Sequence, residues 1–178
     1  MTEIKSAIEI AMERTKSLRL SSEEKEKLKE EETQSRAHGL ANRFLEVDLH
    51  FREVEKELAK YSPEQRSQVE KIMIDDFASG IDPDRNNELI FQGIDILAPD
   101  KRKTILKGEE LIKEYLTQKE KERQKAEKTL RKKLETMGIS GPAVLPKVEG
   151  TQEWADALSA FRALYEEKLK SVQEELRK

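Results

Sequence analysis

Residues 82–88 (DPDRNNE) gather oxygen-bearing side chains at a spacing that resembles the start of a calcium-binding loop. Counted from Asp82, oxygen ligands fall at positions 1, 3 and 5 of such a loop. The glycine required at position 6 is replaced by Asn87, and the bidentate glutamate required at position 12 is replaced by Gly93. Because proline and Asx residues also form the turns between helices, we interpret the segment as a capped turn, with a calcium site as the less favoured alternative.

A second candidate for metal chemistry is the pair Glu46 and His50, which are four residues apart on a predicted helix, with Glu53 and Glu57 nearby. Di-iron helical bundles use Glu-x-x-His pairs together with carboxylates from other helices, all pointing inward. Here the spacing is one residue longer and no second histidine lies close in the sequence. We therefore expect a surface ion pair at this position.

The rest of the sequence offers little catalytic chemistry. The chain has no cysteine, which excludes disulfides, thiolate metal sites and cysteine nucleophiles, and its two histidines are His38 and His50. Its seven glycines are scattered singly, without a P-loop, a dinucleotide-binding fingerprint or a nucleophile elbow. We therefore expect a non-enzymatic protein without cofactor or metal.

Charge is distributed unevenly along the chain. Residues 101–133 carry thirteen basic and six acidic side chains, whereas residues 37–100 carry seven basic and fourteen acidic ones. Such segments suit helical layers that face each other within one molecule or across a dimer. The alternative is that the basic segment binds nucleic-acid phosphates through Lys125, Lys128, Arg131, Lys132 and Lys133. Glutamates interrupt the basic run and the formal net charge is -3, so we favour the structural interpretation.

The elements that position these residues are predicted to be helices. Of the 178 residues, 40% are charged and 35% are hydrophobic, and this composition matches the class of long helices and coiled coils. No stretch approaches the roughly 18 apolar residues of a membrane span, and the charged N-terminal segment does not resemble a secretory signal. We expect an all-α cytoplasmic protein that makes no contact with a membrane.

Apolar residues recur at steps of three and four, which predicts six helices in a single domain, residues 1–178. The expected helices are 2–19, 22–61, 63–79, 86–97, 100–137 and 151–177. The helix at 22–61 is either continuous or broken at Gly39. Gly80 and Gly138, each followed by isoleucine, predict left-handed helix ends. We expect an elongated five- or six-helix bundle with a long antiparallel, coiled-coil-like helix pair.

Two apolar seams are candidates for self-association. The first alternates steps of four and three and consists of Leu40, Phe44, Val47, Phe51, Val54 and Leu58. The second includes Ile105, Ile112, Leu130 and Leu134. A chain this polar has little apolar surface with which to surround such long helices, so we expect burial against a second copy. The loop 138–150 adds Val144 and Leu145, which are expected to contact either the bundle or a partner.

The segments EIKSAIEIAMERT and MGISGPAVLPKVEG, with the following Trp154, resemble a small all-helical bacterial family of unknown function. The resemblance covers the whole chain and implies an all-α bacterial protein, but it carries no activity or site residue. From the residues themselves we predict a structural or protein-interaction module that forms a homodimer or binds another helical protein. A nucleic-acid-binding protein that uses the basic helix is the alternative.

Overall fold

A computed structural model describes residues 21–46 and 49–178 of the chain, so the helix expected at 2–19 and the seam residue Val47 lie outside the described residues. Every regular element in the described part is helical, which confirms the all-α class. The helices are α2 (Ser22–Leu45), α3 (Phe51–Leu58), α4 (Pro63–Gly80), α5 (Glu88–Leu97), α6 (Arg102–Thr136) and α7 (Gln152–Arg177), with a 3-10 turn, η1 (Pro99–Lys101), ahead of α6.

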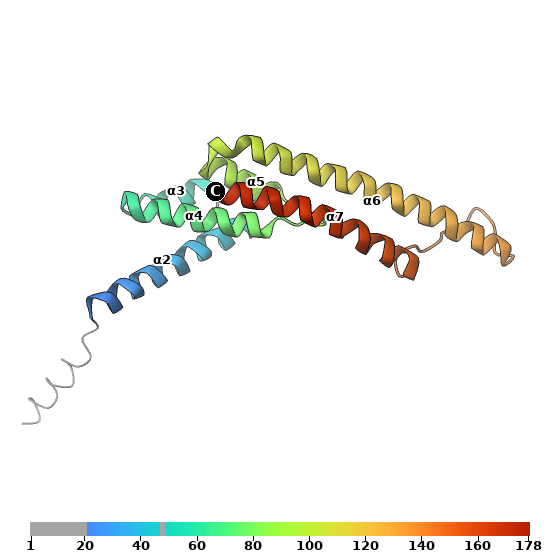
Figure 1. Cartoon of the computed structure of the whole chain (residues 1–178), viewed down its shortest axis with the longest axis horizontal. Coiled ribbons are helices and arrows are strands. Elements are labelled where there is room, and N and C mark those ends of the chain that lie inside the picture. Colours follow the sequence, from blue (N-terminus) through green and yellow to red (C-terminus); the bar gives the residue numbers. More distant parts are fainter. Residues whose placement is uncertain (1–20, 47–48) are drawn as a thin grey trace, which may run out of the picture.

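The described helices form an elongated bundle with a projection at each end (Figure 1). α2, α3, α4 and α5 gather at one end, whereas α6 and α7 lie side by side and antiparallel along the length of the molecule. Beyond α4 and α5, this pair continues as a two-helix projection, residues 117–163, which we term the arm. At the other end residues 22–32 of α2 project into solvent, and every one of them is exposed. The remainder is termed the body.

Side-chain caps fix the starts of several helices. Ser21 and Ser62 each accept a hydrogen bond from the backbone N–H three residues later, and the Glu24 and Gln65 side chains accept one from the backbone N–H of the cap residue. Pro63 occupies the first turn of α4, where its missing N–H costs nothing. Thr151 caps α7 through a hydrogen bond from the Trp154 N–H, at 3.3 Å. These boundaries therefore follow from local sequence.

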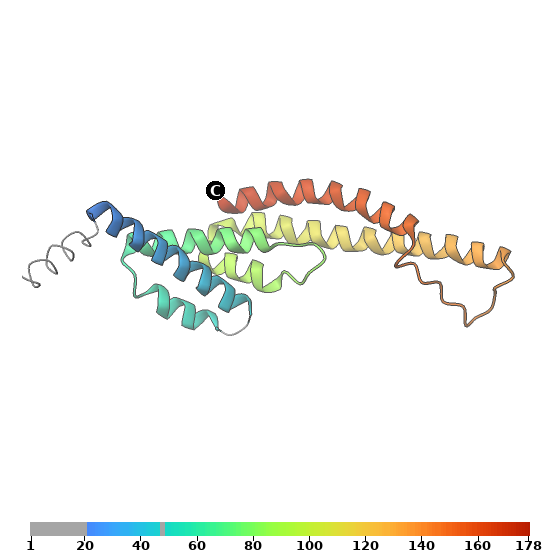
Figure 2. The same cartoon turned by 90° about the horizontal axis from the view of Figure 1, so that it is seen from below.

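In place of the helix expected at 22–61 there are two helices, α2 ending at Leu45 and α3 beginning at Phe51, and Gly39 lies within α2 without breaking it. After Glu46 the chain turns, and the Leu49 N–H donates to the Arg43 carbonyl at 3.2 Å. α3 then packs beside α2 (Figure 2), instead of extending it. A straight helix of this length would carry the second half of the seam away from the body, so burial of that half favours the reversal.

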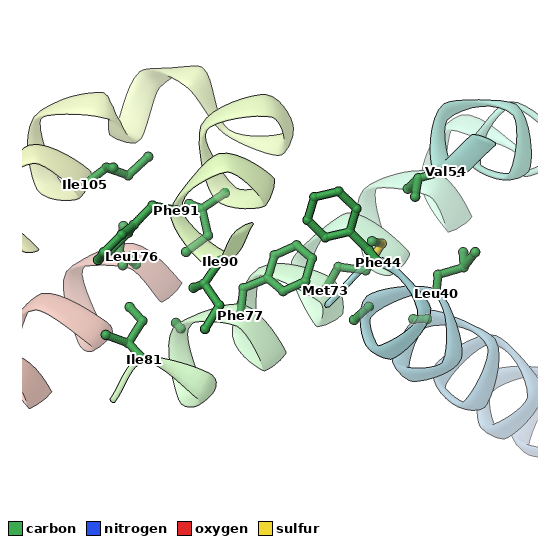
Figure 3. Close-up of a cluster of buried hydrophobic side chains, with 14 of the residues drawn as sticks. Leu40, Phe44, Val54, Met73, Phe77, Ile81, Ile90, Phe91, Ile105 and Leu176 are labelled. Atoms are coloured by element: carbon green, nitrogen blue, oxygen red, sulfur yellow. The ribbon is translucent and has the colours of Figure 1, made fainter. Parts of the chain in front are cut away.

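One hydrophobic core joins all the helices of the body, and Phe77 of α4 lies in its middle (Figure 3). On one side the Phe77 ring packs at 5.6 Å from the ring of Phe44, with Leu40 and Val54 beyond it. On the other side lie residues of α5, α6 and α7, namely Ile90, Phe91, Ile105 and Leu176.

Two glycines shape this packing and its boundaries. At Gly93 a Cβ would lie 2.6 Å from the Phe77 ring, so only a glycine allows α5 to approach α4 this closely. Gly138 has φ +78, and the Ile139 N–H donates to the Leu134 carbonyl at 3.0 Å, which is the left-handed helix end expected there. The same expectation is wrong for Gly80, which is the last residue of α4 and has no positive φ. The coiled-coil character of the α6–α7 pair stays a prediction.

Candidate functional site

The first predicted seam lies in the core of its own chain. Leu40, Phe44, Val54 and Leu58 are buried, and Phe51 is half-buried with its ring 6.3 Å from the Phe44 ring. α4 and α5 pack against α2, and Val54 and Leu58 of α3 belong to the same buried core, so the four buried residues present no surface to a partner while the body is folded. The expectation that this seam faces a second copy is therefore not met by its placement, and an interaction surface has to lie elsewhere.

The second predicted seam is divided between the two parts of the molecule. Ile105 and Ile112 are buried in the body, whereas Leu130 and Leu134 are half-buried in the arm. A third layer of helices covers the seam in the body, and within the described residues no third helix covers it in the arm (Figure 1). The spacing of apolar residues along the sequence does not predict which part of the seam other helices cover.

The loop 138–150 presents an apolar surface at the end of the arm. Val148 is buried and Val144 is half-buried, so the loop packs partly against the helix pair. Leu145 is 83% exposed and Met137 is 71% exposed, and Ile139 is also exposed. We term Met137, Ile139 and Leu145 the apolar tip. Both alternatives for the loop thus have some structural support, because Val144 faces inward in part and Leu145 faces outward.

The segment with calcium-loop spacing forms a turn that ties the body to the arm. The buried Asn87 side chain accepts a hydrogen bond from the Asp82 N–H and donates to two carbonyls of the turn. The Asp84 carboxylate accepts hydrogen bonds from the Tyr115 hydroxyl at 3.0 and 3.1 Å and from Lys119. Arg162 of α7 lies 3.4 Å from the same carboxylate. We term these contacts the Asp84 cluster.

The Tyr115 ring of the Asp84 cluster packs against two other aromatic rings. The fully buried ring of Tyr115 stacks on Phe161 at 5.1 Å and meets the edge of Tyr165 at 5.4 Å. Burial, followed by the hydrogen bond to Asp84, raises the pKa of Tyr115 to about 12. For Asp84, partial desolvation acts to raise the pKa, but the hydrogen bonds from Lys119 and Tyr115 and the nearby cations together lower it. The carboxylate is therefore ionised at neutral pH and its acceptor positions are engaged.

This arrangement suits a structural clamp better than acid–base catalysis. A general acid or base at neutral pH needs a pKa near 7, whereas the pKa of Asp84 is lowered and that of Tyr115 is about 12. Within residues 21–46 and 49–178 no group of three or more His, Asp or Glu side chains is placed to hold a metal ion. The sequence spacing gave no signal for the Asp84 cluster, because its members are separated by up to 78 residues.

The histidines lie apart from each other and from the Asp84 cluster. Glu46 is the C-cap residue that follows α2, and His50 is the N-cap residue that precedes α3, so the expected ion pair on one helix face is wrong. The His50 N–H instead donates to the Glu53 carboxylate at 3.1 Å, which starts α3. His38 Nδ1 lies 2.7 Å from an Asp76 carboxylate oxygen and joins α2 to α4.

Several side chains of the basic segment 101–133 form ion pairs with glutamates. Lys125 pairs with Glu122 at 2.8 Å, and this hydrogen bond lowers the pKa of Glu122. Arg131 pairs with Glu127, and Lys133 pairs with Glu153 of α7. Lys128 and Lys132 make no ion pair with another described residue. Three of the five candidate phosphate contacts are thus already engaged.

An open hollow of about 660 Å³ lies between α2 and the α3–α4 turn. Its lining includes Lys29 and Arg43, and its other cations, Arg36 and Lys60, pair with Glu32 and Glu57. Gly39 contributes open space to the lining. This mixed-charge lining does not indicate one class of ligand.

Comparison of the chain with protein-family models, with curated proteins and with solved structures finds no match. None of the helices in the described part of the chain combines the length and the apolar character needed to span a membrane.

Proposed function

We propose that the protein is a non-enzymatic helical interaction module that self-associates through the projections of the molecule. The observation that carries the proposal is the apolar tip, where Met137 and Leu145 are 71% and 83% exposed at the end of the arm. Three large apolar side chains are thus exposed within nine residues of the chain, and such local concentration is a feature of contact surfaces, whereas isolated exposed leucines are ordinary. Neighbouring helices of a second copy are the proposed partner, and the cytoplasm is the proposed location.

Light scattering after size exclusion tests this proposal over a range of protein concentrations. We expect a mass above the 20.6 kDa of one chain, rising with concentration. The double substitution Met137→Ser and Leu145→Ser should lower that mass. Leu106→Ser is the matched control, because Leu106 is an exposed leucine of α6 in the body. A single-chain mass at every concentration would refute self-association.

A nucleic-acid-binding function is the second candidate, favoured by the two lysines, Lys128 and Lys132, that face solvent without an ion pair in the described part. Its test is the absorbance ratio at 260 and 280 nm of protein purified at low salt. Bound nucleic acid would raise the ratio, and both nuclease and salt should reverse it. A ratio typical of protein alone, together with a mass above that of one chain, would favour the interaction module.

A further inference from the structure

One stripe of α2 changes its character where the helix leaves the body. Within the body it consists of Thr33, Ala37, Leu40 and Phe44, which are all buried. Continued towards the N-terminus at the same alternating steps of three and four, it becomes Glu30, Glu26 and Glu23, which are all exposed. A face that is buried and mostly apolar where α4 covers it is therefore acidic where the described structure leaves it uncovered.

The arm carries a matching stripe of opposite charge. Lys121, Lys125, Lys128 and Lys132 follow each other along α6 at steps of four, three and four, and all four are exposed. We term them the lysine ladder, and Glu23, Glu26 and Glu30 the glutamate ladder. Seven residues separate the first and last glutamates, and seven also separate Lys125 from Lys132. At a rise of about 1.5 Å per residue, both spans are about 10 Å.

The two ladders lie on projections at opposite ends of the molecule (Figure 1). They therefore do not meet within one chain, although helices of opposite charge at this spacing suit each other as neighbours. The surrounding segments are complementary as well. Residues 22–32 carry six acidic and three basic side chains, and residues 121–133 carry two acidic and seven basic ones.

We infer that the glutamate ladder on α2 of one copy docks against the lysine ladder on α6 of another copy. The inference rests on the proposed self-association and names the surfaces that mediate it. Exposed ion pairs are individually weak, so the contact requires several of them together and is sensitive to salt. Because the two surfaces differ, two copies can make the contact twice in a closed pair, or many copies can make it end to end.

Charge reversal on each ladder tests the inference with the full-length chain. Lys128→Glu with Lys132→Glu makes the arm surface acidic, and Glu26→Lys with Glu30→Lys makes the α2 surface basic. Each variant alone brings like charges together and should be monomeric by light scattering. Mixed in equal amounts, the two variants should associate again, because each then offers the complement of the other. Sodium chloride at 0.5 M should weaken association of the unchanged protein about tenfold relative to 0.05 M.

The control is Lys56→Glu with Lys71→Glu, which changes the net charge by the same amount as the lysine-ladder variant, but at two exposed lysines of the body. It should leave association unchanged, and circular dichroism should show equal helix content in all variants. Association of the unchanged protein that neither single-ladder variant reduces would overturn the inference while sparing self-association itself. If the lysine variant removed only bound nucleic acid and left the mass unchanged, the ladder would bind phosphates and the inference would also fail. A protein that is monomeric throughout would remove both proposals.

Discussion

The same pair of helices is packed in two different ways along its length. In the body, Ile105, Ile112 and Tyr115 of α6 are buried together with Leu169 and Val172 of α7. In the arm, most of the apolar residues of the pair are half-buried, namely Ala126, Leu130 and Leu134 of α6 with Leu158 and Phe161 of α7, and Trp154 of α7 is buried. The heptad-like spacing is similar in both parts. The difference is that α4 and α5 add a third layer in the body.

This contrast shows that a pair of helices without further layers buries only the apolar surface along their line of contact. A third layer removes the flanking surface from water and so supplies most of the apolar burial. Stability should therefore be concentrated in the body, and the arm should open locally at a lower cost in free energy. An arm of this kind is suited to meeting a partner, because its seam gains burial when another helix covers it.

Truncating one leucine in each part of α7 should give the largest difference. Leu169→Ala should lower the free energy of unfolding by about 3 kcal/mol, because Leu169 is buried in the core shared by the helices of the body. Leu158→Ala should cost about 1 kcal/mol, because Leu158 is already partly in contact with solvent. Urea denaturation followed by circular dichroism measures both, and equal losses would contradict the division into body and arm.

The third layer can be disturbed without removing any side chain. Gly93→Ala should destabilise the protein by about 2 kcal/mol, because the new methyl group would lie 2.6 Å from Phe77 and 3.0 Å from Phe44. Gly39→Ala is the matched helical control. No atom lies within 4 Å of a Cβ placed there, so the substitution should stabilise α2 by about 0.5–1 kcal/mol. Thermal unfolding compares the two, and a stable Gly93 variant would show that α5 packs loosely.

Local signals in the sequence were sufficient for the fold class and most helix ends. Ser62-Pro63 and Thr151 start helices through caps whose chemistry depends on neighbouring residues only. The division into α2 and α3 could not be predicted in this way. Its seam residues keep the spacing of a continuous helix. What favours two separate helices is burial of Val54 and Leu58 in the core of the body, which is a tertiary interaction.

The interaction surface was harder to predict than the fold. A regular stripe such as Leu40, Phe44 and Val54 indicates that something covers it, but not whether the cover comes from the same chain. Here the cover comes from the core of the same chain. Leu145, by contrast, was identified from its place in a loop, and it is exposed. The Asp84 cluster depends on contacts between residues far apart in sequence, which no local pattern encodes.

The Asp84 cluster lies at the boundary between body and arm. Its loss should therefore affect global stability less than a substitution in the core of the body. Tyr115→Phe keeps the buried ring but removes the hydroxyl that donates to Asp84, and it should cost about 1–2 kcal/mol. Since the pKa of Tyr115 is raised to about 12, its contribution is complete below pH 10 and is lost as the pH rises towards 12. Urea titrations at pH 8 and pH 11 should therefore show that the variant and the unchanged protein differ less in free energy of unfolding at pH 11.

The smallest expected effect is the loss of the stability contributed by Asp84 at low pH. Hydrogen bonds from Lys119 and Tyr115 lower the pKa of Asp84, so its carboxylate stabilises the fold above the ordinary aspartate pKa of about 3.9. This contribution is lost as the pH falls through the lowered value. Asp84→Asn should therefore have a lower free energy of unfolding than the unchanged protein at pH 7, and this difference should become smaller towards pH 3 in urea titrations. A gap that stays constant over this range would mean that Asp84 acts through its shape and its hydrogen bonds, and that its charge contributes nothing at the boundary.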